Sequence, residues 1–202
     1  MNKNIISILL ILLTLSGCAS RKAVTPETTA TPPKETWPAR ETALNQIKSW
    51  HLNGKIAVQS SRDSGSASVD WFQNMSRYSI ALAGPLGSHA MKLSGSGGSV
   101  TLQTSDGKVY RASSPEQLLK AQWGFNLPVS SMNYWIRGLP VPGIPADTRF
   151  DKAGRLVTLI QQGHRIEFQS YSNTGRVALP ERISIVSPSL RVKMIVYSWN
   201  VG

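Results

Sequence analysis

The sequence predicts a mainly β protein of the α+β class, built on one strongly curved antiparallel sheet of about ten to eleven strands. Three observations predict it. Apolar and polar side chains alternate with a period of two in successive runs after Trp50. Turn signals separate these runs at short intervals, which favours antiparallel hairpins. The alternation lapses between residues 113 and 140, where helical patterns replace it.

The first 17 residues have the pattern of a bacterial export signal. Lys3 precedes an apolar run at residues 5–13, and Leu15-Ser-Gly-Cys18 follows. This run is well short of the ~20 apolar residues that a helix needs to cross a bilayer. We therefore expect residues 1–17 to be a lipoprotein signal peptide that is cleaved before Cys18.

Leu15-Ser-Gly-Cys18 resembles the lipobox, whose cysteine receives a diacylglyceryl group. Cys18 is the single cysteine of the chain, so it cannot form an internal disulfide. Burial of acyl chains stabilises anchoring by ~0.8 kcal/mol per methylene, and two or more chains hold stably. Ala19 follows, where lipoproteins retained at the inner membrane typically carry Asp. These features predict anchoring to the outer membrane, on its periplasmic face, by lipid on Cys18.

Residues 18–38 are expected to be the acylated cysteine and a flexible tether, because the segment is rich in Thr and Pro and poor in apolar residues. Residues 39–202 are expected to be a single domain. Ala39, Leu44, Ile47 and Trp50 follow Pro38 at near-helical spacing, which predicts a short helix over residues 38–50.

The alternating runs then predict a series of strands. They are residues 50–59, 67–71, 78–82, 91–93, 100–103, 109–111, 148–150, 156–161, 165–169, 183–186 and 191–199. Within the interruption, Ser114 is a candidate N-cap and Pro115 the first residue of a helix with Leu118, Leu119 and Trp123 on its apolar side. A second helix runs through Met132, Trp135 and Ile136 and ends at Gly138.

The composition argues against catalysis and against nucleic-acid binding. The three histidines lack metal-ligand spacing, no nucleophile has a visible base, and the Gly95-Ser-Gly-Gly98 cluster lacks the strand-to-helix context of a phosphate loop. We expect no enzyme activity, no metal and no cofactor. The net charge of +11 would attract anionic headgroups or an acidic protein surface. Nucleic acid is not expected as a partner of an exported, acylated chain.

The turn Gly84-Pro85-Leu86-Gly87 follows a predicted strand and should project Leu86 outward without apolar neighbours. With other motifs it carries a resemblance to a known family. The motifs are Gly54-Lys-Ile-Ala-Val58, Trp71-Phe-Gln73, Gly84-Pro-Leu-Gly87, Leu127-Pro128, Tyr134-Trp-Ile-Arg-Gly-Leu-Pro140, Gln162-Gly163 and Trp199. In this order, over roughly residues 44–199, they resemble the outer-membrane lipoprotein receptor family LolB.

The resemblance implies an incomplete antiparallel β-barrel with a helical lid that encloses an apolar cavity. A member of this family receives acylated lipoproteins from the periplasmic carrier LolA and inserts them into the outer-membrane phospholipid, as a monomer in our expectation. Leu86, with Gly84, Pro85 and Gly87, matches the family's protruding loop, whose leucine acts at membrane insertion.

Apolar phases of the strands, together with the second helix, supply the residues expected to line an acyl-chain cavity. They are Ile56, Val58, Val69, Trp71, Tyr78, Ile80, Leu82, Met91, Leu93, Val100, Leu102, Trp135 and Ile136. The residues alone favour a filled core, whereas the resemblance favours the cavity. Two rival functions stay open: a structural or sensory envelope lipoprotein that binds a peptide, glycan or other lipid, and a lipid-modifying enzyme without a recognised motif.

Overall fold

The computed structural model describes residues 36–61, 63–124 and 126–202, without the side chain of Trp123. The signal peptide, Cys18 and most of the tether lie outside the described residues. The described chain belongs to one compact unit. None of its helices is long and apolar enough to cross a membrane.

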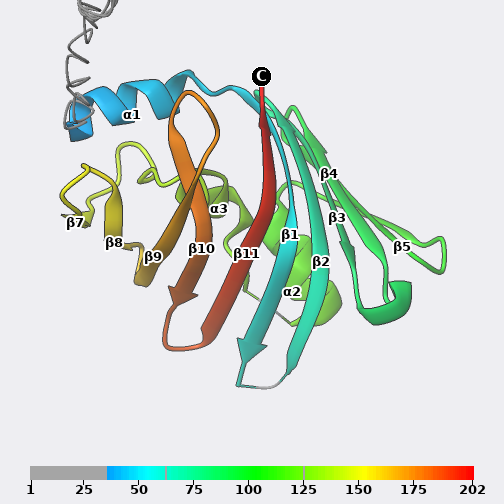
Figure 1. Ribbon diagram of the computed structural model, residues 1–202. Helices are drawn as coiled ribbons and strands as arrows, with labels where there is room; N and C mark the ends of the chain where they lie inside the picture. Colours follow the sequence, from blue (N-terminus) through cyan, green and yellow to red (C-terminus); the bar gives the residue numbers. More distant parts are fainter. Residues whose placement is uncertain (1–35, 62, 125) are drawn as a thin grey trace, which may run out of the picture. The chain divides into compact units, whose positions relative to one another are not determined.

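Eleven antiparallel strands form one sheet in the order β6-β5-β4-β3-β2-β1-β11-β10-β9-β8-β7. The strands are β1 Ser49–Ser60, β2 Ser64–Asn74, β3 Arg77–Ala83, β4 Met91–Ser96, β5 Ser99–Thr104, β6 Val109–Ala112, β7 Asp147–Phe150, β8 Leu156–Gln161, β9 His164–Asn173, β10 Ala178–Val186 and β11 Leu190–Val201. The first and last strands pair at the centre, so β6 and β7 are the free edges and the sheet does not close. Figure 1 shows this arrangement.

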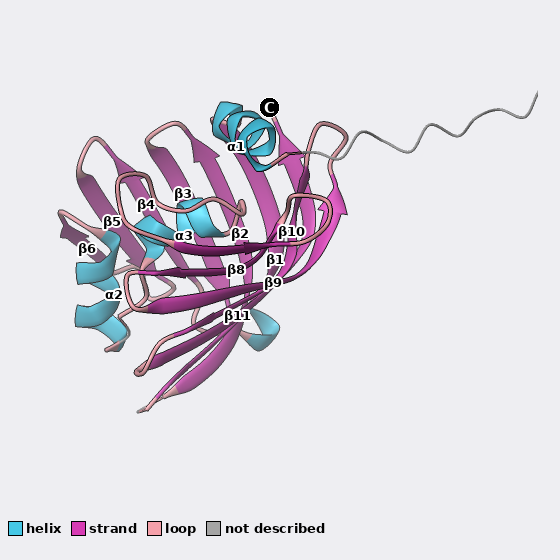
Figure 2. Ribbon diagram, turned by 90° about the vertical axis from the view of Figure 1, so that its left-hand side faces the viewer, coloured by secondary structure: helices cyan, strands magenta, loops and turns pink. Residues whose placement is uncertain are grey.

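Three helices accompany the sheet: α1 Trp37–Gln46, α2 Pro115–Trp123 and α3 Val129–Trp135. A short 3-10 turn, η1, spans Pro85–Gly87. The segment that carries α2 and α3 connects the two edge strands, and both helices lie within the curve of the sheet (Figure 2). Ser114 caps α2 by accepting a hydrogen bond from Gln117 N, and Gly138 follows α3 with φ of 77°.

The predicted fold class is confirmed: the protein is mainly β, with an open antiparallel sheet and three helices. Each predicted strand lies inside an observed strand. The predicted helix over residues 38–50 is wrong at its C-terminal end. The helix ends at Gln46, because Trp50 pairs with Val201 and Gln73 in β1. At the other end, Trp37 and Pro38 begin α1 rather than belong to the tether, since proline suits the first turn of a helix.

The curvature of the sheet has a local cause where β1 meets β11. The pairing register shifts between Asn53 and Gly54, which is a β-bulge that increases twist. Gly54 is required there, because a Cβ at this position would lie 2.2 Å from Ile195 O. Trp50, earlier in the same strand, is buried, and its ring centroid lies 5.3 Å from that of Trp71 and 5.5 Å from that of Trp199.

Candidate functional site

A narrow apolar void lies between the inner face of the sheet and the helices. Its volume is about 30 Å³, roughly the space of one water molecule. The lining residues are Ile56, Val69, Trp71, Ile80, Leu82, Met91, Leu93, Leu119, Leu127, Val129, Met132 and Met194. In this conformation the expected cavity is therefore closed: the site has an apolar lining without room for an acyl chain.

The structure brings seven of the thirteen predicted cavity residues together around the void: Ile56, Val69, Trp71, Ile80, Leu82, Met91 and Leu93. All seven come from the inward phase of β1 to β4. Five further residues complete the lining and were missing from the predicted set: Leu119, Leu127, Val129, Met132 and Met194. Helical spacing marked Leu119 and Met132 as apolar positions, and strand alternation marked Met194, but neither pattern says which core residues border a gap.

The other predicted cavity residues lie elsewhere. Val100 and Leu102 belong to β5 and are buried in the core, and Val58 in β1 is half-buried. Tyr78 lines a neighbouring pocket. Trp135 and Ile136 are fully buried core residues rather than lining residues. Their acyl-chain contacts remain predictions.

Buried hydrogen bonds fix α3 and the segment that follows it. Gln161 in β8, only 2% exposed, makes four of them through one amide. Its Oε1 accepts from Trp135 Nε1 at 3.0 Å and from Val141 N at 2.8 Å. Its Nε2 donates to Val141 O at 3.0 Å and to Ile144 O at 2.9 Å. Both ends of this amide are satisfied, so the contact is fully paired although it is buried.

Arg137 provides a second buried attachment just beyond α3. Its guanidinium donates to Ile47 O at 3.1 Å and to Asn133 O at 2.9 Å. Burial lowers the pKa of this guanidinium below its usual range. The link to Ile47 joins α3 to the segment between α1 and β1.

The attachment of α2 is different. Leu118 and Leu119 are buried, and the helix packs against the edge strand β6 and its neighbour β5. Glu116 Oε1 accepts from Ser130 N at 2.8 Å, which links the first turn of α2 to the first turn of α3. Among the described residues, no side-chain hydrogen bond connects α2 to the sheet. Apolar contact therefore holds α2 in place.

The turn after β3 presents Leu86 to solvent. Its side chain is fully exposed and its backbone is left-handed, with φ of 56° and ψ of 27°. The turn is closed by Gly84 N, which donates to Ser88 O at 2.8 Å, and by Ser88 Oγ, which donates to Pro85 O at 2.8 Å. A fully exposed leucine in this left-handed conformation contributes little to the stability of the fold.

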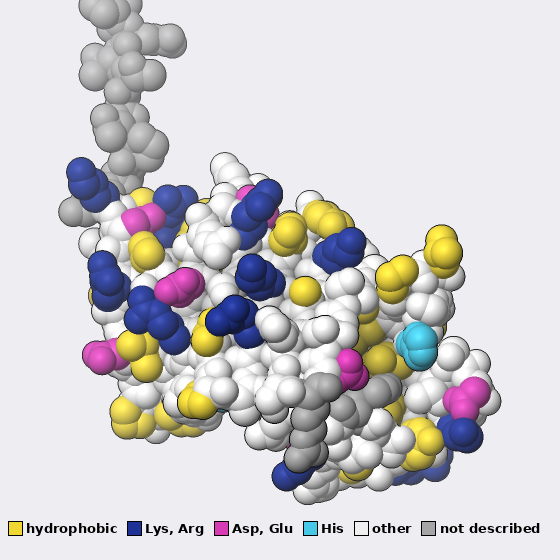
Figure 3. Space-filling view, turned by 90° about the horizontal axis from the view of Figure 1, so that it is seen from below, with side chains coloured by type: hydrophobic (Ala, Val, Ile, Leu, Met, Phe, Trp, Pro, Cys, Tyr) yellow, Lys and Arg dark blue, Asp and Glu magenta, His cyan; other side chains and the backbone are white. Residues whose placement is uncertain are grey.

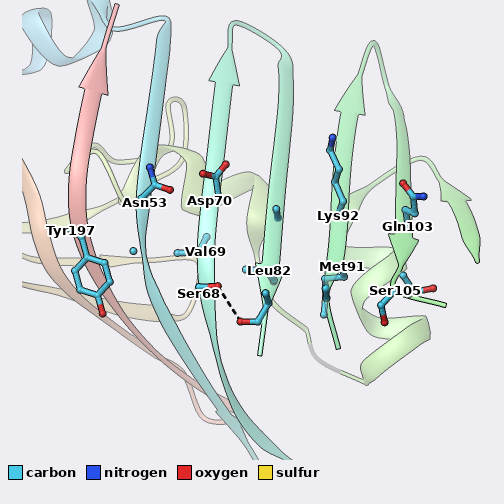
Figure 4. Close-up of a pocket in the computed structure, with 15 residues that line it drawn as sticks. Asn53, Ser68, Val69, Asp70, Leu82, Met91, Lys92, Gln103, Ser105 and Tyr197 are labelled. Carbon is cyan, nitrogen blue, oxygen red and sulfur yellow. Dashed lines mark hydrogen bonds between the residues drawn. The ribbon is translucent and has the colours of Figure 1, made fainter. Parts of the chain in front are cut away.

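The largest hollow lies on the opposite, outer face of the sheet. It has a volume of about 600 Å³ and is open to solvent across β11 and β1 to β5. Tyr197, Asn53, Asp70, Lys92 and Gln103 project from these strands (Figure 4). Because the sheet separates this hollow from α2 and α3, it is not part of the apolar void. The five side chains named above come from the polar phase of the strands, whereas Val69, Leu82 and Met91 border both the hollow and the void.

Charge on the surface is unevenly balanced. Figure 3 shows more Lys and Arg than Asp and Glu on one face, in keeping with a net charge of +11. His51 Nε2 and Asp70 Oδ2 form an exposed hydrogen bond at 2.9 Å on the outer face of β1 and β2. Among the described residues, no three His, Cys, Asp or Glu side chains are grouped for metal binding.

Comparison with known proteins gives a family. Residues 48–199 match the family model described as outer membrane lipoprotein LolB. An outer-membrane lipoprotein LolB of Pseudomonas putida (strain F1) is 38% identical over 164 residues, covering 81% of this chain and 80% of that protein. The LolB of Pseudomonas aeruginosa (strain PAO1) is 37% identical over 189 residues, covering 92% of this chain and 90% of that protein.

Solved structures agree on the fold. A LolA superfamily protein from Nitrosomonas europaea superposes with a TM-score of 0.54 at 10% identity, covering 83% of this chain and 94% of that chain. A DUF1329 family protein from Desulfovibrio piger superposes with a TM-score of 0.51 at 8% identity, covering 83% of this chain and 93% of that chain. At these identities the likeness concerns the curved sheet with its helices and nothing further.

Proposed function

The chain belongs to the LolB family of outer-membrane lipoproteins, and from this premise we propose that it accepts acylated lipoproteins from LolA and inserts them into the outer membrane. Family membership carries the proposal. The structure supports it with an entirely apolar lining between α2, α3 and β1 to β4. Such a lining has no hydrogen-bonding group to satisfy and suits a hydrocarbon ligand.

We propose that the void widens into an acyl-chain cavity when α2 moves away from the sheet. Helix α2 is the part of the lining held by apolar contacts, so an incoming chain can replace those contacts with its own. Each methylene transferred from water gains ~0.8 kcal/mol. Met91, Met132 and Met194 line the void, and flexible thioether side chains repack readily around different chains.

The transfer needs no catalytic group in this proposal. A chain moves from carrier to receptor and then to the bilayer if each station binds it more favourably than the last. The rival of a structural or sensory envelope lipoprotein predicts that no acyl chain binds between α2 and the sheet. Mass spectrometry of ligands that copurify with a form lacking residues 1–18 separates the two, since a bound acyl chain supports the receptor and a ligand-free core supports the rival.

The acyl anchor on Cys18 serves, in this proposal, to raise the local concentration of the receptor near the bilayer. The positive charge adds attraction to anionic headgroups. A monomer is sufficient, because the void and the Leu86 turn lie on one chain. A form lacking residues 1–18 should therefore still accept lipoproteins from LolA. Failure to accept them would show that Cys18 does more than localise the protein.

Leu86 is the residue we assign to the membrane step. Its exposed side chain gains ~1.5 to 3 kcal/mol on entering the acyl region, which orients the molecule without anchoring it. Leu86→Glu should leave acceptance from LolA intact and slow insertion into liposomes by at least about tenfold, because a carboxylate resists entering hydrocarbon. Acceptance is measured by transfer of a labelled lipoprotein between the two purified proteins, and insertion by its recovery with the liposomes.

Val157→Glu is the matched control. Val157 is a partly exposed apolar residue on β8, on a different part of the surface, and the same charge there should leave both steps unchanged. Insertion at the normal rate by Leu86→Glu would show that Leu86 has no membrane role. Loss of both steps in Leu86→Glu would place the residue at acceptance instead.

A further inference from the structure

A second pocket adjoins the apolar void at one end. It has a volume of about 370 Å³ and lies between the turn that joins β2 to β3 and the first turns of α2 and α3. Trp71 and Val129 border both spaces, so these two side chains lie between the void and the pocket. The chemistry changes there, because Gln73, Ser76 and Asn133 bring polar groups to a site next to hydrocarbon.

Two polar atoms of the residues that line this pocket are buried without a hydrogen-bond partner: the Tyr78 hydroxyl and Asn133 Oδ1. Buried polar groups are paired in the great majority of cases, so each exception calls for a physical reason. By contrast, Gln73 nearby is paired at both ends, with Trp71 Nε1 and with Met75 O. The unpaired state is therefore specific to Tyr78 and Asn133 among these three polar side chains.

The position of Tyr78 is fixed by the sheet. Its ring lies over Gly95 in β4, where an added Cβ would come within 2.2 Å of the ring. Burial, with a contribution from Glu116, raises the pKa of Tyr78 to about 12. The phenol is thus neutral at neutral pH and has a proton to donate, whereas Asn133 Oδ1 is an acceptor.

We propose that this pocket binds the linkage region of the lipid-modified cysteine of the cargo, where acyl chains are joined through ester and amide groups. The Tyr78 hydroxyl donates to a carbonyl oxygen of the linkage, Asn133 Oδ1 accepts from an amide N–H, and the chains pass Trp71 and Val129 into the widened void. The inference rests on the proposed acceptor function and adds the part of the ligand that is recognised by hydrogen bonds.

The same contacts explain why the two atoms are unpaired in the closed protein. Pro115, the first residue of α2, forms part of the pocket wall, and Glu116 is bound to Ser130 N at 2.8 Å. Displacement of α2 therefore opens the polar pocket and the apolar void together. Cargo would supply the missing hydrogen bonds at the moment the hydrocarbon contacts of α2 are replaced.

Tyr78→Phe tests the inference, because it removes the hydroxyl and keeps the ring over Gly95. The protein is used without residues 1–18, a form that retains the compact unit. Two fluorescent probes are titrated: a triacylated cysteinyl hexapeptide, which has the linkage, and a pyrene-labelled hexadecane, which lacks it. The variant should bind the lipopeptide about tenfold more weakly and the alkane within about twofold of the original protein. Asn133→Leu should show the same selectivity.

Tyr110→Phe is the matched control, since Tyr110 is a half-buried tyrosine of β6 that packs on the core outside this pocket. It should bind both probes as the original protein does. Thermal unfolding of each variant confirms that it is folded. Equal weakening of both probes by Tyr78→Phe, or of neither, would overturn the inference while leaving the acceptor function intact. Failure of the original protein to bind either probe would overturn the acceptor function, and the inference with it.

Discussion

The two helices that cover the inner face of the sheet differ in how they are held. Helix α3 and the residues just after it are attached by buried hydrogen bonds to Gln161 and from Arg137. Helix α2 rests on Leu118 and Leu119, and among its described side chains the one long-range hydrogen bond, through Glu116, goes to α3. Hydrogen bonds fix a position, whereas hydrocarbon contacts can be exchanged for those of a ligand. The difference indicates that α3 is a fixed wall and α2 the moving one.

Two tyrosines show the same contrast within the sheet. Tyr171 in β9 donates its hydroxyl to Leu156 O at 2.6 Å, and its ring lies between the guanidinium groups of Arg40 and Arg155, 5.3 Å and 5.1 Å from the ring centroid. Tyr78 in β3 has a buried hydroxyl without a partner. The Tyr171 hydroxyl is thus paired, whereas the Tyr78 hydroxyl retains unused hydrogen-bonding capacity, as does Asn133 Oδ1 on the face of α3 beside the same pocket.

The strongest test of the fixed wall is Gln161→Leu. The substitution keeps the volume roughly constant and leaves Trp135 Nε1 and the backbone groups of Val141 and Ile144 without partners. We expect a loss of about 4 kcal/mol in the free energy of unfolding, measured in urea. Gln169→Leu, at an exposed position of β9, is the control and should change stability by less than about 0.5 kcal/mol. A loss below about 1 kcal/mol for Gln161→Leu would show that these hydrogen bonds do not fix α3.

The two tyrosines provide a test with a smaller expected effect. The same change, tyrosine to phenylalanine, should have different effects on stability at the two positions. Tyr171→Phe breaks a made hydrogen bond and should lower the free energy of unfolding by about 1 kcal/mol, since Leu156 O loses its partner. Tyr78→Phe removes a hydroxyl that has no partner and should leave stability unchanged or raise it slightly. Equal destabilisation by the two substitutions would mean that the Tyr78 hydroxyl is paired in the free protein, which would remove the contrast.

The sequence predicted the strands well, because alternation is a local signal that this sheet follows. The prediction from the sequence failed where pairing with a residue far along the chain determines the secondary structure. Helical spacing continues through Ile47 to Trp50, yet Trp50 belongs to β1, since it pairs with Val201 at the other end of the chain. The inward phase of β1 to β4 was read correctly as one apolar surface, whereas the volume left beside it depends on how α2 packs, which no pattern in the sequence specifies.

The attachments of α3 were equally hidden from sequence reasoning. Gln161 is the last residue of β8, and the alternation of that strand predicts only that its side chain points inward. The alternation does not identify its partner Trp135, which lies 26 residues away in the sequence. Arg137 reaches Ile47, 90 residues earlier. Trp135 and Ile136 were expected to line the cavity from the second helix. In the structure both are fully buried, and Trp135 donates a hydrogen bond to Gln161, a contact that no apolar pattern could predict.

The smallest effect is expected from loosening α2 alone. Ser114→Ala removes the N-cap, whose Oγ accepts from Gln117 N at 3.3 Å, and such a loss costs about 1 kcal/mol of helix stability. If α2 opens independently of the sheet, amide hydrogen exchange within α2 should become about fivefold faster, while exchange of α3 through its own local openings stays unchanged. Ser113→Ala is the control, because Ser113 Oγ contacts only the Gln117 side chain.

The same variant connects stability to transfer. When opening of α2 limits entry of the acyl chains, the uptake of a lipoprotein from LolA should accelerate by about the factor seen in α2 exchange, because both follow the same opening equilibrium. Insertion into liposomes should keep its rate, since Leu86 lies outside this equilibrium. Faster exchange in α2 and α3 together would show that the two helices open as one unit, and the division into a fixed and a moving wall would then be wrong.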